Sequence, residues 1–259
     1  MRGKKIIGIG CYRLESRLSD MQNNKLCLEK NTINIWSANL THLAQHEAIC
    51  LALLSPDELA RANRYKVGKA KSTFVLARGI LRYLLARYLS IAPEKITFDY
   101  TAHKKPFLAS IHQSNLSFSM THSGEMALFA FGYDREIGVD IEKIGSHDYE
   151  EIAKRFFTET ESERLLSLSD DKRAVFFYQL WTRKEAVLKA MGLGLTVPLN
   201  QVEVLDQDQP IYIAQKEWFY QTLFVDQLQL PVNYQVAIAS DKPLTQLYCL
   251  WIDNFAAFL

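Results

Sequence analysis

The sequence predicts an α+β fold built from two similar halves, each with helices packed on a small antiparallel sheet. In each half, the helix-like hydrophobic patterns are grouped together and a run of strand-like patterns follows them, as in α+β folds. The polar tripeptide Asp134-Arg135-Glu136 interrupts this pattern between two β-like runs. Charge also divides here, because residues 1–135 carry 19 Lys or Arg against 10 Asp or Glu, whereas residues 136–259 carry 11 against 19. We therefore expect an N-terminal half at 31–135 and a C-terminal half at 136–259, preceded by an extension at 1–30.

The composition is that of a soluble globular protein, with 259 residues, 48% hydrophobic and 23% charged. The four cysteines show no C-x-x-C pair or metal-ligand spacing, which favours reduced thiols in the cytoplasm. The apolar run at 6–11 is too short for a signal-peptide core or a membrane span. We expect a cytoplasmic protein with no membrane partner.

The elements of the N-terminal half follow from local patterns. Apolar and polar residues alternate over 31–40, which predicts a strand. Ser55 before Pro56 predicts a helix start, with serine as N-cap and proline in the first turn. An apolar stripe predicts a second helix at 72–89. Short β-like runs complete this half, at 96–100, 116–120 and 126–133.

The C-terminal half opens with a β-like run at 137–142. Thr158 and Glu161 have the spacing of a capping box, and Gly192 is predicted to end the last helix. The helices of this half are predicted at 149–157, 159–168 and 171–191. Further β-like runs are predicted near 202–205, 218–225, 232–239 and 247–252.

Two acidic segments give the strongest functional signal. Asp140 and Glu142 lie two residues apart in a strand pattern, so their side chains leave the same face. Glu185 and Lys189 lie four residues apart in a helix and share one face. Carboxylates that converge with a lysine suit a hard cation such as Mg²⁺ and a phosphate. Each pair has a plainer alternative: solvated acids on an edge strand, and an ordinary ion pair along a helix.

The stretch 61–87 contains eight Lys or Arg and no acid. Lys71, Arg78 and Arg82 are spaced seven and four residues apart and form one stripe on the predicted helix. Such a stripe suits a phosphate-rich small molecule or a nucleic acid. The aromatic residues here fall mostly on the apolar face, which disfavours base stacking and hence nucleic acid. A further alternative is that the opposite charges of the two halves only attract each other.

A third signal lies at Thr121-His122-Ser123-Gly124, which ends a strand pattern. Hydroxyls, an imidazole and turn N–H groups at one point suit an anion. The alternative is a simple β-turn with His122 on the surface. The chain contains no G-x-x-x-x-G-K-[ST], G-x-G-x-x-G, H-E-x-x-H or G-x-S-x-G, so the common nucleotide, metalloprotease and hydrolase sites lack support.

Five segments in order resemble the phosphopantetheinyl transferases, and more closely the two-domain type that serves peptide synthetases. The segments are KPFL (105–108), FSMTHSG (118–124), IGVDIE (137–142), IAKRFFTETE (152–161) and LWTRKEAVLKAMGLGL (180–195). The resemblance implies two halves related by a pseudo-twofold axis, with the active site at their interface. It implies a monomer that transfers the 4′-phosphopantetheine arm of coenzyme A to a serine hydroxyl of an apo acyl or peptidyl carrier protein. The other product would be 3′,5′-ADP, and Mg²⁺ would be the cofactor.

The resemblance also implies roles for individual residues. Asp140, Glu142 and Glu185 would bind Mg²⁺, and Glu185 would accept the serine proton as a base. Lys189 would contact the phosphate being transferred, so that Glu185, Lys189, Asp140 and His122 form the catalytic set. Coenzyme contacts and the clamp on its phosphates would come from Lys71, Arg78, Arg61, Lys105, Thr121, His122 and Lys189.

Two functions of other classes are also compatible with the sequence. One is a catalytically silent module that binds carrier proteins, which the complete set of carboxylates, lysine and histidine disfavours. The other is a nucleic-acid-binding protein that uses the stretch 61–87. Peptide, polyketide, siderophore and fatty-acid carriers all offer a serine, and the sequence does not rank them.

Overall fold

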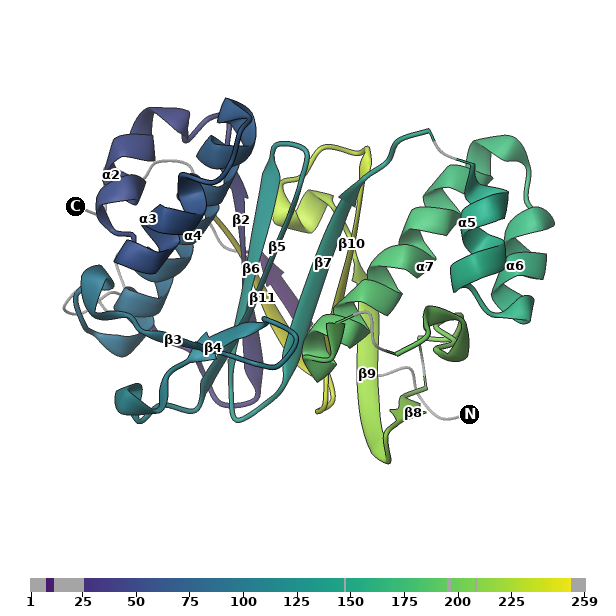
Figure 1. Ribbon diagram of the computed structural model, residues 1–259. Coiled ribbons are helices and arrows are strands. Elements are labelled where there is room, and N and C mark those ends of the chain that lie inside the picture. Colours follow the sequence, from purple (N-terminus) through teal and green to yellow (C-terminus); the bar gives the residue numbers. More distant parts are fainter. Residues whose placement is uncertain (1–7, 12–25, 147, 195–196, 208, 253–259) are drawn as a thin grey trace.

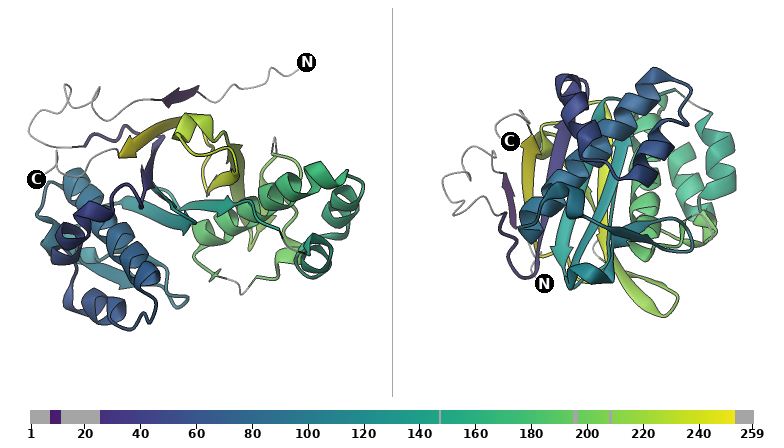
Figure 2. Two further views of the ribbon diagram at one scale, coloured as in Figure 1. Left: turned by 90° about the horizontal axis from the view of Figure 1, so that it is seen from above. Right: turned by 60° about the vertical axis from the view of Figure 1, so that its left-hand side comes forward.

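The computed structural model describes residues 8–11, 26–146, 148–194, 197–207 and 209–252. Its elements form two lobes side by side, with sheets in the middle and helices on the outer faces (Figure 1). Seen from above, the two groups of helices lie at opposite ends of the molecule (Figure 2). The predicted α+β class is confirmed.

The first sheet has the strand order β1-β11-β2-β6-β5, and the second has the order β7-β10-β9-β8. The first consists of β1 (Gly8–Cys11), β2 (Thr32–Asn39), β5 (Leu116–Ser123), β6 (Met126–Tyr133) and β11 (Gln246–Ile252). The second consists of β7 (Ile137–Lys143), β8 (Ile211–Ile213), β9 (Lys216–Leu223) and β10 (Tyr234–Ser240). A separate ribbon pairs β3 (Phe98–Tyr100) with β4 (Pro106–Leu108).

Helices α2, α3 and α4 belong to the first lobe, and α5, α6 and α7 belong to the second (Figure 1). Those of the first lobe are α2 (Glu47–Ala52), α3 (Pro56–Ala62) and α4 (Gly68–Leu89). Those of the second lobe are α5 (Tyr149–Phe156), α6 (Glu159–Leu166) and α7 (Asp170–Met191). The bounds of the two long helices, α4 and α7, differ by at most four residues from the predicted helices at 72–89 and 171–191.

The first sheet is mixed, whereas an antiparallel sheet was predicted. β11 follows the second lobe in sequence but pairs in parallel with β2, and β1 pairs in parallel with β11. β11 therefore lies inside the first sheet, where both of its faces are covered. Its nearly continuous apolar run, Leu247–Ile252, is typical of a strand buried on both sides. All strand pairs of the second sheet are antiparallel.

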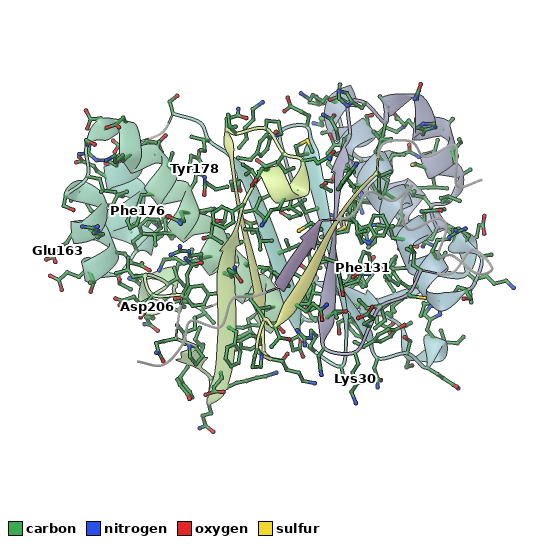
Figure 3. All side chains as sticks on the ribbon, turned by 180° about the vertical axis from the view of Figure 1, so that it is seen from behind. Lys30, Phe131, Glu163, Phe176, Tyr178 and Asp206 are labelled. Atoms are coloured by element: carbon green, nitrogen blue, oxygen red, sulfur yellow. The ribbon has the colours of Figure 1, made fainter. Side chains whose placement is uncertain are left out.

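Three apolar cores hold the layers together. One lies between the first sheet and the helices of its lobe, and includes Trp36 and Phe131. A middle core joins residues of both sheets, such as Ile35 and Val139. The third lies beneath α7 and includes Phe177. In a view from behind, Phe131 lies within the first lobe, while Phe176 and Tyr178 lie on the helical side of the second (Figure 3).

Strand β7 divides its residues between two of these cores. Ile137, Val139 and Ile141 enter the middle core. Because successive side chains of a strand point to opposite faces, the alternate residues Gly138, Asp140 and Glu142 face α7. The alternation therefore directs both acids of this strand toward one helix.

Gly138 sets the distance between β7 and α7. A Cβ atom at this position would lie 1.9 Å from the carbonyl oxygen of Ala186 and 2.4 Å from the backbone nitrogen of Ala190. Both contacts are with backbone, which cannot rotate aside. Glycine is therefore required for the close approach of helix to strand.

We predict that Gly138→Ala destabilises the protein by about 3 kcal/mol, because it forces α7 away from β7. Gly68→Ala is the matched control, since a Cβ at Gly68 meets nothing within 4 Å. That control should leave the stability unchanged or raise it by up to about 1 kcal/mol. Urea unfolding of both variants measures the difference, and equal stabilities would contradict the packing described.

Local signals in the sequence placed the helix ends well. Capping boxes begin α3, with Ser55 and Glu58, and α6, with Thr158 and Glu161. Gly192 follows α7 with a φ of 70°, the left-handed conformation that glycine adopts without strain. These predicted boundaries are confirmed.

The strand predicted at 202–205 is wrong. This segment follows a short 3₁₀ helix at Leu199–Gln201 and pairs with no strand of the described chain. Its backbone groups bond to charged side chains instead. Lys184 Nζ donates to the carbonyl of Val202, and the N–H of Val204 donates to Glu161 Oε1 at 2.8 Å. The burial of its valines, which made the segment resemble a strand, comes from packing against α7.

None of the described helices is both long enough and apolar enough to span a membrane.

Candidate active site

The two lobes meet along a seam of hydroxyl groups between β5 and β7. These strands are edges of different sheets. The N–H of Val139 donates to Ser119 Oγ at 3.1 Å, and the N–H of Lys143 donates to Ser123 Oγ at 3.0 Å. The contacts advance by four residues on both strands, so β5 and β7 run in the same direction. Side-chain oxygens of β5 thus accept the hydrogen bonds that a neighbouring strand would otherwise accept.

Asp140 lies at the centre of this seam and is buried. Its Oδ1 accepts a hydrogen bond from Lys189 Nζ at 2.6 Å and another from Thr121 Oγ1 at 3.1 Å. Lys189 Nζ also donates to Thr121 Oγ1 at 3.0 Å. The three groups come from β7, α7 and β5, so a single carboxylate oxygen joins both lobes.

The second oxygen of Asp140 is different. Oδ2 is buried and has no hydrogen-bond partner among the described residues. Burial raises the pKa of Asp140, while the ammonium of Lys189 and the hydroxyl of Thr121 oppose that rise. A buried carboxylate oxygen without a donor is costly. It is therefore a group able to bind a further cation or donor.

Glu142 and Glu185 extend the acidic site. Ser123 Oγ donates to Glu142 Oε2 at 2.8 Å. Burial raises the pKa of Glu185, and the negative charges of Asp140 and Glu142 raise it further. Within the described residues, however, these carboxylates do not form a group that could hold a metal ion.

Helix α7 is held in register by bonds on its other side. Arg183 Nη1 donates to the carbonyl of Val204 at 2.9 Å. Lys184 is fully buried and forms an ion pair with the buried Glu161 of α6 at 2.6 Å. Glu185 shares a helix face with Lys189, four residues later, and Lys189 bonds to Asp140 of β7. The face that carries Glu185 is therefore directed toward β7.

His122 is the exposed neighbour of this cluster on β5. Partial burial of its ring, and then the ammonium of Lys189, lower the pKa of His122 below its ordinary value. The imidazole is therefore neutral at neutral pH and can both donate and accept a hydrogen bond.

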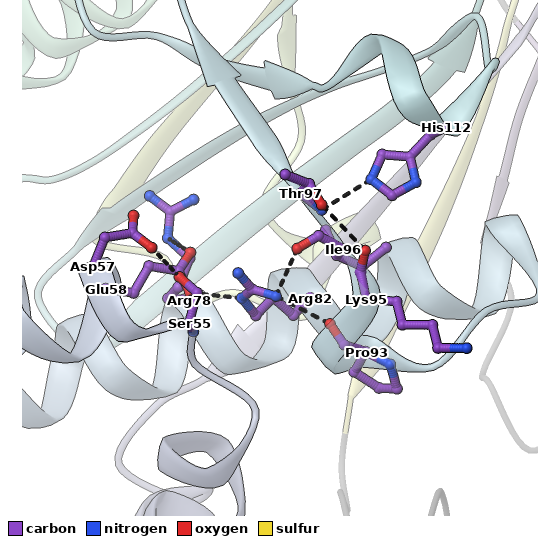
Figure 4. A network of polar contacts seen from close by, with 10 residues as sticks. All are labelled: Ser55, Asp57, Glu58, Arg78, Arg82, Pro93, Lys95, Ile96, Thr97 and His112. Carbon is purple, nitrogen blue, oxygen red and sulfur yellow. Dashed lines mark hydrogen bonds and ion pairs between the residues drawn. The ribbon is translucent and has the colours of Figure 1, made fainter.

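The basic stripe on α4 is partly used within the first lobe. Arg82 Nε forms an ion pair with Glu58 at 2.6 Å, and Arg78 Nε lies 3.4 Å from the same carboxylate (Figure 4). The Arg78 guanidinium lies 5.2 Å from the ring centre of Phe98, and its buried Nη1 bonds to no described residue. Arg78 thus keeps hydrogen-bonding capacity that Arg82 has used.

The other predicted basic residues have separate surroundings. Lys71 is exposed in part and its Nζ donates to Asn63 at 3.0 Å. Arg61 is exposed, with its guanidinium 5.1 Å from the ring centre of Phe74. Both lie on the first lobe near Arg78.

Lys105 is not joined to the acidic cluster. Its Nζ donates to the backbone carbonyls of Ile137 and Ala190, each at 3.2 Å. The ammonium thereby links the first lobe to the start of β7 and the end of α7, where helix carbonyls favour a cation. Burial lowers the pKa of Lys105.

Ser119 lies in the candidate site although the sequence did not predict it, and Ser123 was predicted only as part of an anion-binding turn. Their signal was present, because Ser119, Thr121 and Ser123 place a hydroxyl at every second position of β5. Strand alternation then puts all three on one face. The direction of that face toward β7 depends on how the lobes pack.

Comparison with known proteins identifies the family. The sequence profile of the 4′-phosphopantetheinyl transferase superfamily matches residues 136–239, and that of the 4′-phosphopantetheinyl transferase N-terminal region matches residues 34–132. 4′-Phosphopantetheinyl transferase HetI of Nostoc sp. is 39% identical over 181 residues, covering 69% of this chain and 76% of HetI. This chain belongs to the 4′-phosphopantetheinyl transferase superfamily.

Two relatives with lower sequence identity are also named as phosphopantetheinyl transferases. 4′-Phosphopantetheinyl transferase Sfp of Bacillus subtilis is 28% identical over 194 residues, covering 74% of this chain and 84% of Sfp. The human L-aminoadipate-semialdehyde dehydrogenase-phosphopantetheinyl transferase is 28% identical over 214 residues, covering 73% of this chain and 68% of that protein. The family resemblance read from the sequence is confirmed, and a silent binding module is not favoured.

We predict that Glu185→Gln raises the melting temperature at pH 7 in buffer containing EDTA. The raised pKa means that the folded protein holds the Glu185 proton more tightly than the unfolded chain does, so ionisation at neutral pH costs stability. This cost is absent below the ordinary value of 4.5 and grows as pH rises toward the folded pKa. Calorimetry should therefore show a gain at pH 7 that disappears near pH 4. A lower melting temperature at pH 7 would contradict the burial and charge described.

Proposed function

We propose that this transferase moves the 4′-phosphopantetheine arm of coenzyme A to a serine hydroxyl of an apo acyl or peptidyl carrier protein. The products are the loaded carrier and 3′,5′-ADP. The observation that carries the proposal is the cluster of Asp140, Lys189 and Thr121, with Glu185 beside it, because it combines acids and an ammonium at one seam. We further propose that the lobes are related by a pseudo-twofold axis, that the active site lies at their interface, and that the protein acts as a monomer.

The residues of the seam fit Mg²⁺ in chemistry. Carboxylate oxygens are the ligands that this ion prefers, and Oδ2 of Asp140 accepts no hydrogen bond from the described residues. Within the described ranges, no three His, Cys, Asp or Glu side chains already form a metal-holding group. Asp140, Glu142 and Glu185 would hold the ion after adjusting their side chains. When bound, Mg²⁺ would neutralise charge that develops on the pyrophosphate.

Glu185 is proposed as the base. Its carboxylate would take the proton from the carrier serine as the serine oxygen attacks the phosphorus bonded to the pantetheine arm. The bond from that phosphorus to the bridging oxygen breaks, and 3′,5′-ADP leaves with the electron pair. A raised pKa makes Glu185 a better proton acceptor than an ordinary glutamate.

Cationic and polar groups would bind the coenzyme. Lys189 would contact the transferred phosphate, and neutral His122 would hydrogen-bond a phosphate oxygen with Thr121 beside it. Arg78 is supported as a ligand because its Nη1 donates no hydrogen bond within the part of the chain that the structure describes. The remaining coenzyme contacts are proposed for three cations of the first lobe: Lys71, Arg61 and Lys105. Lys105 would have to release the two backbone carbonyls to which it donates.

We predict that Glu185→Gln lowers the transfer rate by about 10²–10⁴-fold, the range for removal of a general base. Mass spectrometry of an apo carrier incubated with coenzyme A and Mg²⁺ measures the rate. Glu94→Gln is the matched control, because Glu94 is an exposed glutamate of the first lobe. This variant should transfer the arm at the wild-type rate.

Two results would contradict the proposal. Retained activity of Glu185→Gln would exclude this residue as the base. The wild-type chain should also be tested on a panel of peptide, polyketide, siderophore and fatty-acid carriers. If it adds the arm to none of them, the silent binding module is favoured. The same panel shows which carrier class is served.

A further inference from the structure

A second cluster crosses the lobes next to the active site. Tyr234 of β10 is fully buried, and its hydroxyl donates to Glu125 Oε2 at 3.0 Å. The N–H of Glu125 donates back to the Tyr234 oxygen at 3.3 Å. Lys143 of β7 completes the cluster with an ion pair to Glu125 at 2.9 Å. The tyrosine and lysine belong to the second lobe, whereas Glu125 belongs to the first.

The cluster acts on the turn that ends β5. Gly124 and Glu125 form a two-residue turn between Ser123 and Met126, which are paired across the hairpin. Gly124 has a φ of 57°, which suits the first position of such a turn. A Cβ on Gly124 would lie 2.5 Å from the Tyr234 oxygen and 3.0 Å from Lys143 Cδ. The turn is therefore pressed directly against the two second-lobe residues.

The same turn continues into the hydroxyls of the active site. Ser123 directly precedes Gly124, and its Oγ both donates to Glu142 and accepts from the N–H of Lys143. Lys143 therefore touches this strand end twice, once through its backbone and once through its ammonium. Any movement of the turn away from Tyr234 would carry Ser123 away from Glu142.

Electrostatics favour the contact of the turn residue Glu125 with Tyr234 and Lys143. The hydrogen bonds from Lys143 and Tyr234 lower the pKa of Glu125 to about 2, so its carboxylate is charged throughout the physiological range. The Tyr234 hydroxyl is buried and needs a partner, and Glu125 supplies it. The charged Glu125 carboxylate therefore accepts from both Tyr234 and Lys143 at neutral pH.

We propose that Glu125, Tyr234 and Lys143 form a positioning clamp that holds the end of β5. The clamp keeps Thr121 hydrogen-bonded to Asp140 and Ser123 hydrogen-bonded to Glu142. The side chains of Tyr234 and Lys143 bond to Glu125 rather than to a proposed catalytic group, and the clamp acts through Ser123. This inference rests on the proposed transfer reaction, in which those carboxylates take part.

The first test removes single groups from the clamp. Tyr234→Phe deletes only the hydroxyl and should lower kcat on the order of tenfold, because small misplacements of catalytic groups are costly. The KM for coenzyme A should stay within about twofold, because the proposed binding groups remain. Glu125→Gln keeps an acceptor for Tyr234 and should lose less activity than Glu125→Ala.

A matched control separates positioning from general loss of an ion pair. Lys143→Met and Lys216→Met each remove a 2.9 Å ion pair from a lysine whose side chain is about equally exposed, 40% and 44%. Lys216 bonds to Asp241, away from the turn. Only Lys143→Met should lower kcat. Equal losses in the two variants would overturn the clamp.

Coupling to Ser123 gives the sharpest readout. If the clamp acts through this serine, Tyr234→Phe combined with Ser123→Ala should be no slower than Ser123→Ala alone. Losses that multiply would overturn the proposal, as would wild-type kcat in Tyr234→Phe.

An activity-independent measurement distinguishes failure of the clamp from failure of the proposed function. Hydrogen exchange of a peptide covering 121–126 should be faster in Tyr234→Phe than in the wild type, with exchange in α4 unchanged. Unchanged exchange at 121–126 would overturn the clamp even in an active enzyme. An inactive wild type with faster exchange in the variant would overturn the transfer reaction and support the clamp.

Discussion

The structure depends on how the buried carboxylate of Asp140 is compensated. A charged carboxylate removed from water is stable only with partners, and these come from both lobes: Thr121 from β5 and Lys189 from α7. The packing of the lobes and the geometry of the site are therefore a single constraint. Gly138 makes it achievable, because it brings α7 close enough to β7 for Lys189 to reach the acid.

Buried ion pairs in this protein differ in how completely they are satisfied. Glu161 accepts bonds from Lys184, from Thr158 and from Val204, so both of its oxygens are used. Asp140 keeps one oxygen without a donor among the described residues. The completed pair holds α7 in place, and the incomplete one lies at the seam. Glu58, which pairs with Arg82 and Arg78, likewise keeps its Oε1 without a hydrogen-bond partner among the described residues. Unsatisfied capacity is therefore found at both places where the sequence predicted ligand contacts.

The sequence predicted what depends on short-range periodicity. The shared faces of Asp140 with Glu142 and of Glu185 with Lys189 follow from strand and helix geometry alone. Contacts between segments far apart in the sequence were not predicted. The parallel pairing of β11 with β2 and the carbonyl partners of Lys105 depend on how the lobes close. The segment 202–205 was misread because a buried valine pattern does not reveal whether strands or charged side chains satisfy the backbone.

The division of charge along the sequence has a more specific meaning in the fold. Part of the positive charge of the first lobe is neutralised internally, since Arg82 and Arg78 share Glu58. In the acidic half, Lys189 is held by Asp140. Leaving Asp140 buried and unpaired would cost about 3–5 kcal/mol, so Lys189 keeps this pair. Its ammonium has three N–H donors and, within the described residues, uses two of them, on Asp140 and Thr121. The third donor can bond an anion without breaking the pair with Asp140.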